Sequence, residues 1–228
     1  MSSKKLATVV IPCMNEEKTL PSLISQMRKK GYRLLVPIAK RSSDGTRKVC
    51  ENAGVEHFMD SGRGKGCAIS ESVWHVKTPF LVFFDGDGSH EISDIAVLLD
   101  RMEKTGADLV LASRLTGGSM ELYDGTWDGF FRSFFTLCIN HIINVRFGSR
   151  ITDAPNGFRA GRTEKLRQLD LRSSRYEVEV EMIMKALKRG MKIEECPSRE
   201  YPRVSGTGGL SVAWDGMRYI WIVFSNLI

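Results

Sequence analysis

The chain has 228 residues, which suits one domain with a sizeable core, because single cores commonly serve roughly 100 to 250 residues. Hydrophobic residues make up 42% of it and charged residues 26%, which excludes wholesale disorder, a collagen-like fold and a polytopic membrane protein. The formal net charge is +6, and residues 126–228 alone have 16 Lys and Arg against 11 Asp and Glu. This basic half indicates an anionic partner: nucleic acid, a phosphate-bearing substrate or an acidic lipid surface.

The cysteines and the N-terminus indicate a reducing, cytoplasmic setting. Five widely spaced cysteines without a CxxC pair argue against both a disulfide framework and a zinc site. The first five residues carry positive charge, but a strand-like run ending in Pro12 follows them, where a signal peptide would have its apolar region and cleavage site.

Strand-like and helical patterns alternate through the first half of the chain. The sequence predicts strands over 7–12, 33–38, 55–59, 80–84 and 108–112. It predicts helices over 17–30, 46–53, 67–76 and 92–104. Strands separated by helices indicate a doubly wound, mostly parallel α/β sheet, in which ligands bind beyond the carboxyl ends of the strands.

The second half is organised differently. A long helical stretch from about Gly129 leads to Asp153-Ala154-Pro155-Asn156-Gly157-Phe158-Arg159, and a further helix is predicted near 176–189. Strands and loops over 191–211 close the expected single domain, 1–211. An apolar segment, 212–228, follows it, and its abrupt end leaves open whether the natural chain continues.

Asp85-Gly86-Asp87 directly follows the apolar run 80–84. Both carboxylates therefore project from one strand end on the same side, with a glycine between them that lets a ligand approach the backbone. Mg²⁺ is usually held by one or two carboxylates plus substrate phosphates, so the motif suits a divalent ion bound with a nucleoside diphosphate. A polar turn rich in Asp and Gly is the alternative interpretation.

Five motifs follow one another along the chain: Val9–Glu17, Ser42–Thr46, Gly64–Ala68, Asp85–Asp87 and Asp153–Arg159. Together they resemble the inverting GT-A glycosyltransferases of family 2, and among them the dolichyl-phosphate or polyprenyl-phosphate mannose or glucose synthases. The resemblance covers roughly residues 6 to 211.

The resemblance implies a GT-A fold and a division of labour among the matching positions. Pro12, Cys13 and Glu16 would line the base and ribose of a nucleotide-sugar donor, and Lys65 and Gly66 would close that pocket. Asp85, Gly86 and Asp87 would meet the ribose, the Mg²⁺ or Mn²⁺ ion and the diphosphate.

Two acidic residues have structural alternatives. Glu16 could instead stabilise a helix N-terminus, where carboxylates are favoured. Asp44, in Ser42-Ser43-Asp44-Gly45-Thr46 ahead of a helix, fits an N-cap or a turn better than a ligand contact.

The chain departs from the family pattern after the second strand. Ala39 and Lys40 stand where the family usually has an Asp pair, which leaves the nucleotide base open. Lys40 could offset diphosphate charge, worth about 4 kcal/mol for unit charges about 4 Å apart at an effective dielectric near 20, before desolvation is subtracted. The sequence supports equally well the interpretation that Lys40 is a solvated surface lysine.

Two apolar segments point to a lipid acceptor or a membrane surface. Apolar residues over 130–143 recur at helical spacing, so this amphipathic helix either packs on the sheet or uses its aromatic end to line a groove for a lipid chain. The run 217–228 is far shorter than the roughly 20 residues that span a bilayer. Together with the basic half, it predicts peripheral association with an anionic, cytoplasmic membrane face.

A lipid phosphate would already present an anionic oxygen, so the enzyme would need to align it and neutralise charge more than it would need a base. The resemblance assigns phosphate contacts to Arg114, Arg132 and Arg203, with Arg159 as a weaker fourth. Residues 206–209 are expected to form a glycine-rich loop that closes over substrate.

The predicted activity is metal-dependent, inverting transfer of a sugar from a nucleoside diphosphate to a polyprenyl phosphate, with Asp87 as the first residue to test. Transfer to a soluble hydroxyl acceptor and noncatalytic nucleotide-sugar binding are the alternatives. Nucleic acid is not expected as a partner, because the basic residues are scattered and carry no groove-reading motif. The sugar, the polyprenol and the oligomeric state stay open.

Overall fold

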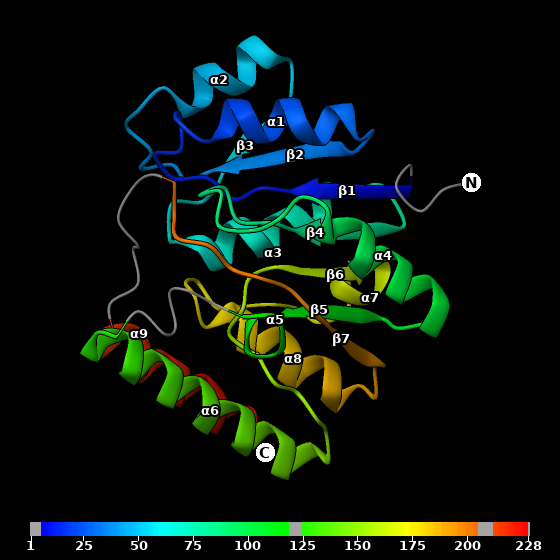
Figure 1. Cartoon of the computed structure of the whole chain (residues 1–228), viewed down its shortest axis with the longest axis vertical. Coiled ribbons are helices and arrows are strands. Elements are labelled where there is room, and N and C mark those ends of the chain that lie inside the picture. Colours follow the sequence, from blue (N-terminus) through cyan, green and yellow to red (C-terminus); the bar gives the residue numbers. More distant parts are fainter. Residues whose placement is uncertain (1–5, 119–124, 205–211, 228) are drawn as a thin grey trace.

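A computed structural model of the chain describes residues 6–118, 125–204 and 212–227. Its strands form one sheet in the order β3-β2-β1-β4-β6-β5-β7 (Figure 1). They are β1 (Ala7–Val10), β2 (Arg33–Ile38), β3 (Glu56–Met59), β4 (Phe80–Phe83), β5 (Leu109–Ser113), β6 (Arg159–Arg162) and β7 (Ile193–Pro197). Every pair is parallel except the two that β6 makes with β4 and β5, so the predicted doubly wound, mostly parallel sheet is confirmed.

Helices cover both faces of this sheet. One face carries α1 (Leu20–Lys29), α2 (Thr46–Ala53) and α4 (Asp94–Thr105). The other carries α3 (Lys65–His75), α6 (Trp127–Phe147), α7 (Thr163–Arg167), α8 (Val178–Lys188) and α9 (Val212–Ser225), and the short α5 (Arg114–Gly117) follows β5. Because both faces are covered, β1 and β4 are apolar and buried at almost every position, as parallel strands generally are.

Strand β6 was not predicted by the sequence, and neither were the short helices α5 and α7. The four residues of β6, Arg-Ala-Gly-Arg, include no β-branched or aromatic side chain, so they carry no strand pattern. It forms a strand because β4 and β5 offer it hydrogen-bonding partners on both sides. Pairing with β4 and β5, and not the local sequence, therefore makes residues 159–162 a strand within the sheet.

Helices α6 and α9 contact each other beneath the sheet, on the side away from α1 and α2 (Figure 1). The predicted helix over 130–143 is confirmed as part of α6, whose Ile139 and Ile143 are buried in the core. Four aromatic side chains nearer its N-terminus are exposed: Trp127, Phe130, Phe131 and Phe134. None of the helices in the described ranges combines the length and apolar character needed to cross a bilayer.

Candidate active site

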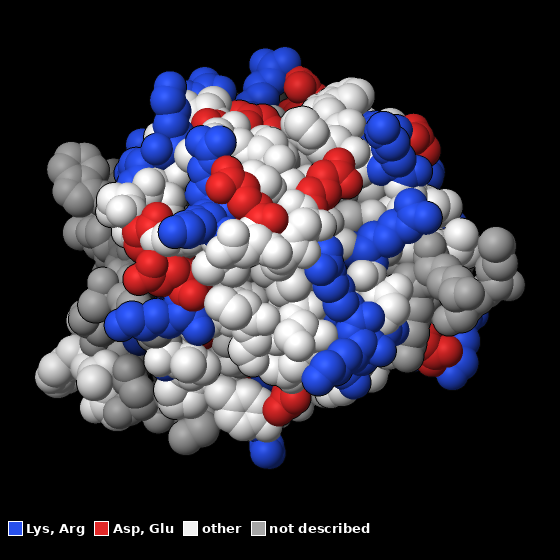
Figure 2. Space-filling view, turned by 90° about the horizontal axis from the view of Figure 1, so that it is seen from above, with Lys and Arg blue, Asp and Glu red and all other residues white. Residues whose placement is uncertain are grey.

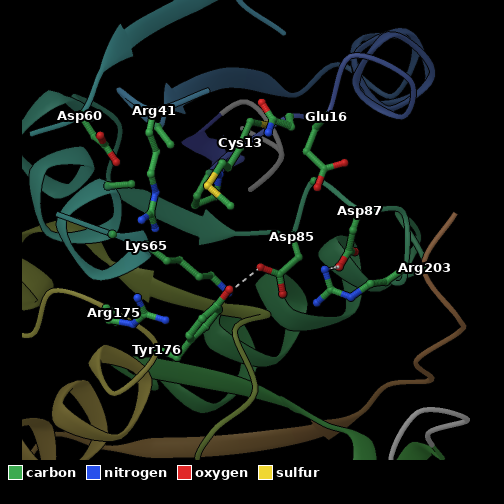
Figure 3. A pocket seen from close by; sticks show the side chains of 17 residues that line it. Cys13, Glu16, Arg41, Asp60, Lys65, Asp85, Asp87, Arg175, Tyr176 and Arg203 are labelled. Atoms are coloured by element: carbon green, nitrogen blue, oxygen red, sulfur yellow. Dashed lines mark ion pairs between the residues drawn. The ribbon is translucent and has the colours of Figure 1, made fainter. Parts of the chain in front are cut away.

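A pocket of about 480 Å³ opens at the carboxyl ends of β1 to β4, where the sequence predicted ligand binding (Figure 3). Its volume lies within the range of small-molecule sites. It is lined by Pro12, Cys13, Met14, Asn15, Glu16, Ala39, Arg41, Asp60, Gly64, Lys65, Ala68, Asp85, Gly86, Asp87, Arg175, Tyr176 and Arg203. Acidic and basic side chains are equally represented in this lining, so the pocket can bind an anion and a cation side by side.

Lys65 bridges two carboxylates at the base of the pocket. Its Nζ lies 2.7 Å from Asp85 Oδ1 and 3.1 Å from Glu179 Oε1 (Figure 3 shows the first pair). Asp85 Oδ2 also lies 3.6 Å from Nε2 of the buried His90. Helix α3 supplies the lysine, the end of β4 supplies Asp85, and α8 supplies Glu179, so this cluster joins three elements at the site.

These contacts shift the protonation equilibria of the cluster. Burial alone would raise the pKa of Asp85, but Lys65 and His90 outweigh it and hold that pKa well below its ordinary value. Burial would lower the pKa of Lys65, yet the two carboxylates raise it. For Glu179 desolvation outweighs the same ammonium, so its pKa is raised. Asp85 and Lys65 are therefore firmly charged at neutral pH.

Asp87 is buried and holds the opposite end of the pocket together. Its Oδ1 accepts hydrogen bonds from the backbone N–H of Ser89 (3.0 Å) and from the Ser89 hydroxyl (2.7 Å). Its Oδ2 lies 3.1 Å from Arg203 Nη1, and its carbonyl accepts the Val204 N–H. Arg203 reaches the site from far along the chain because this contact pins its segment to the end of β4.

Glu16 faces the pocket and does not cap a helix. The Thr19 hydroxyl donates to Glu16 Oε2 at 2.9 Å, and α1 has no side-chain cap. Desolvation raises the pKa of the Glu16 carboxyl, partly opposed by that hydrogen bond. Asp44 takes the structural role that the sequence favoured: it accepts the backbone N–H groups of Thr46 (3.0 Å) and Glu17 (3.0 Å).

Two glycines are required by close packing at the site. A Cβ at Gly157 would lie 2.8 Å from Lys65 Nζ and 2.9 Å from Asp85 Oδ2, so a side chain there would push the ion pair apart. A Cβ at Gly66 would lie 2.3 Å from the carbonyl oxygen of Ser173. Gly66 does not line the pocket itself, but it lets the segment that carries Arg175 and Tyr176 approach it.

Three of the arginines predicted to contact phosphate lie outside the pocket lining. Arg114 donates to Asp153 Oδ2 (2.8 Å) and Oδ1 (3.0 Å) and to Glu200 Oε1 (3.2 Å). Arg132 lies on α6. Arg159 is 1% exposed and donates to backbone carbonyls, including that of Glu179 (2.9 Å), so it supports the fold and does not face an acceptor.

Lys40 is exposed and does not line the pocket; its backbone N–H donates to Asp60 Oδ1 at 2.9 Å. This position favours the surface-lysine interpretation over diphosphate binding. The predicted loop 206–209 lies outside the described residues.

Four charged or aromatic lining residues were not predicted: Arg41, Asp60, Arg175 and Tyr176. Arg41 and Asp60 come just after β2 and β3, so the rule that ligands bind beyond strand ends could have found them. Arg175 and Tyr176 precede α8 and carry no local signal. The Tyr176 ring lies 5.7 Å from Lys65 Nζ, and its carbonyl accepts the Tyr219 hydroxyl of α9 at 3.0 Å.

The chemistry of Asp85 and Asp87 fits a divalent ion that is completed by substrate. Both are hard carboxylate donors in the pocket lining, and each faces a protein cation. Within the described ranges, no three acidic, His or Cys side chains gather as a metal cluster. Mg²⁺ and Mn²⁺ accept one or two carboxylates when phosphate oxygens and water supply the other ligands.

Comparison with known proteins gives a consistent result. Residues 8–170 match the family model described as glycosyl transferase family 2. Glycosyltransferase AglJ of Haloferax volcanii is 32% identical over 212 residues, which cover 91% of this chain and 67% of AglJ. Polyprenol monophosphomannose synthase of Mycolicibacterium smegmatis is 27% identical over 218 residues, which cover 89% of this chain and 80% of the synthase.

Solved structures share the fold. Glucosyl-3-phosphoglycerate synthase from Mycobacterium tuberculosis, in complex with Mn²⁺, uridine diphosphate and glucosyl-3-phosphoglycerate, superimposes with a TM-score of 0.71. The match covers 98% of this chain and 80% of that chain, at 18% sequence identity. At this identity the likeness establishes the architecture alone.

Proposed function

Since the chain belongs to glycosyl transferase family 2 and is a glycosyltransferase, we propose that it transfers a sugar from a nucleoside diphosphate to a polyprenyl phosphate, with inversion at the anomeric carbon. The donor would occupy the pocket at the carboxyl ends of β1 to β4. The observation that carries the acceptor class is an exposed apolar surface on α6.

This surface, the aromatic ridge, consists of side chains near the N-terminal end of α6. Their exposed fractions are 78% for Trp127, 58% for Phe130, 44% for Phe131 and 52% for Phe134. The rings of Trp127, Phe130 and Phe131 contact one another, with centroids 5.8 Å apart for Phe130 and Phe131. An exposed cluster of large aromatic side chains is expected to bind a lipid or a membrane interface.

Helix α9 extends the same apolar character beside α6. Its exposed side chains include Met217, Ile220, Trp221 and Phe224. The Tyr219 hydroxyl donates to the carbonyl of Tyr176, which lines the pocket. This contact supports a lipid acceptor arriving along α6 and α9 and presenting its phosphate near the donor. The name of the Mycolicibacterium relative, polyprenol monophosphomannose synthase, supports the same acceptor class.

Asp85 and Asp87 would hold Mg²⁺ or Mn²⁺ together with the donor diphosphate. When bound, the ion offsets the charge that develops on the leaving diphosphate. Lys65 keeps Asp85 ionised and oriented, and Arg203 lies against Asp87 where it can donate to phosphate oxygens.

The acceptor phosphate needs alignment more than deprotonation, because its oxygen is already anionic at neutral pH. Arg203 is the arginine of the proposed set that lines the pocket, so we assign it the main phosphate contact. Arg132 shares α6 with the aromatic ridge and is proposed as a second contact. Arg114 would act indirectly, by holding Asp153 and Glu200 in place.

Extraction of the product tests this acceptor class. With Mg²⁺, a radiolabelled nucleotide sugar and a short polyprenyl phosphate, we expect label in the organic phase that depends on protein, metal and lipid together. Label that stays in the aqueous phase as a glycoside of a soluble acceptor would favour the alternative activity.

We further propose that the aromatic ridge docks on anionic membrane at the cytoplasmic face. The double substitution Phe130→Ser and Phe131→Ser should lower recovery with anionic liposomes in flotation at least about tenfold, since burying one aromatic side chain contributes roughly 1.5–3 kcal/mol. Trp74→Ser is the matched control, because Trp74 is 68% exposed on α3, away from the ridge. Equal recovery of the double variant and wild type would overturn this docking surface.

A further inference from the structure

The end of the pocket away from Asp87 and Arg203 is formed by the residues that follow β2 and β3 (Figure 3). Ala39 and Lys40 directly follow β2. The Ala39 methyl cannot accept a hydrogen bond, and the Lys40 side chain is exposed outside the lining. Neither residue that directly follows β2 therefore brings a carboxylate to this end of the pocket.

Asp60, which directly follows β3, brings a carboxylate to the same end. Its side chain lines the pocket and is 4% exposed. Oδ1 accepts the backbone N–H groups of Lys40 at 2.9 Å and Gly62 at 2.8 Å. The Asp60 N–H donates to Ile38 on β2 at 2.9 Å. The carboxylate is thus held in one orientation, and its Oδ1 already accepts two hydrogen bonds.

The other oxygen, Oδ2, is shielded from solvent and has no hydrogen-bond partner among the described residues. A buried acceptor without a hydrogen bond destabilises a protein by about 1–3 kcal/mol, and most buried polar atoms therefore have a hydrogen-bond partner. Arg41 lies at this end of the pocket beside Asp60 (Figure 3). It is exposed and makes no hydrogen bond or ion pair with the described part of the chain, so it can move to admit a ligand.

We propose that Asp60 reads the nucleobase of the donor through Oδ2, and that the base it selects is uracil. This inference rests on the proposed function, because it assumes a nucleotide donor in the pocket. Uracil offers one imino N–H, at N3, which matches a single open acceptor. Guanine offers two adjacent donors, N1–H and the N2 amino group, which suit a carboxylate with both oxygens open. Cytosine presents an acceptor at N3, which the carboxylate repels.

The substitution Asp60→Asn tests this directly. The two backbone N–H donors at Oδ1 require an oxygen there, so the amide must place its NH₂ group where Oδ2 was. An acceptor then becomes a donor, which opposes uracil N3–H and matches cytosine N3. With Mg²⁺ present, calorimetric titration should show wild type preferring UDP over CDP and GDP. Asp60→Asn should weaken UDP about ten- to a hundredfold and bind CDP at least as well as UDP.

Glu71→Gln is the matched control. Glu71 lies on α3 and accepts the N–H of Ser61, the residue after Asp60, at 3.3 Å, but it does not line the pocket. This control substitution should leave the ratio of UDP to CDP affinity unchanged. The melting temperature of Asp60→Asn shows whether this variant is folded. If the folded variant keeps the wild-type ratio of UDP to CDP affinity, the role of Asp60 is overturned while the proposed function stays intact. Failure of every nucleotide to bind wild type would overturn the proposed function as well.

Discussion

Asp87→Asn should slow sugar transfer by roughly two orders of magnitude or more, equivalent to about 3 kcal/mol or more of transition-state stabilisation. The amide can still accept from Ser89 through its oxygen, so the local turn is kept. Its NH₂ group, however, replaces the anionic oxygen that faces Arg203 and removes a ligand for the divalent ion. Initial rates at saturating donor and metal measure this loss.

Asp100→Asn provides the comparison for this variant. Asp100 pairs with Lys104 on the outer surface of α4 and is 56% exposed, so its loss should change neither turnover nor stability by much. Both variants should melt close to wild type. Turnover near the wild-type value for Asp87→Asn would contradict a role for Asp87 in binding the metal or the diphosphate.

Lys65→Met should destabilise the protein by about 3–5 kcal/mol, because it removes the ammonium between the buried carboxylate of Glu179 and the partly buried carboxylate of Asp85 and leaves both uncompensated. Chemical denaturation at neutral pH measures this change. Lys104→Met is the control, since breaking its exposed pair with Asp100 should cost no more than about 1 kcal/mol. Equal stability losses for the two variants would contradict the cluster.

The pH dependence of this loss has a definite sign. In wild type the pKa of Asp85 is lowered, so its contribution is fully present above the ordinary carboxyl pKa near 4 and is lost only as the pH falls through the lowered value. Without Lys65, burial raises the pKa of Asp85 and of Glu179, and stability falls as the pH rises through those values. The difference between variant and wild type should therefore be largest at neutral pH and shrink toward pH 4. Adding Glu179→Gln to the variant should restore part of the loss.

Much of the pocket at the carboxyl ends of β1 to β4 follows from patterns that are local in sequence. Apolar runs bounded by polar residues predicted the five strands that begin with β1 and end with β5, and a parallel sheet brings their carboxyl ends to one edge. Pro12 and Asp85 follow two of these strands, whereas Lys65 was assigned to the same pocket by the resemblance to family 2 glycosyltransferases. Asp60 obeys the same rule, because it directly follows β3 and lines the pocket.

What the sequence could not predict depends on contacts between distant segments. Nothing near Arg114 indicates that Asp153 and Glu200 would both bind its guanidinium. Arg159 sits in a polar motif, yet its side chain is 1% exposed in the core. The backbone approach that brings Tyr176 to the pocket requires Gly66, a residue about 110 positions away. Such partners are chosen by packing, which periodicity and spacing do not encode.

The mass of the lipid recovered after the reaction tests the central claim most directly. Wild-type protein with Mg²⁺, a uridine diphosphate sugar and a short polyprenyl phosphate should yield a lipid phosphate heavier by one sugar residue, and chelation of the metal should abolish this product. An unchanged lipid mass, accompanied by donor cleavage or a water-soluble glycoside, would contradict transfer to a polyprenyl phosphate.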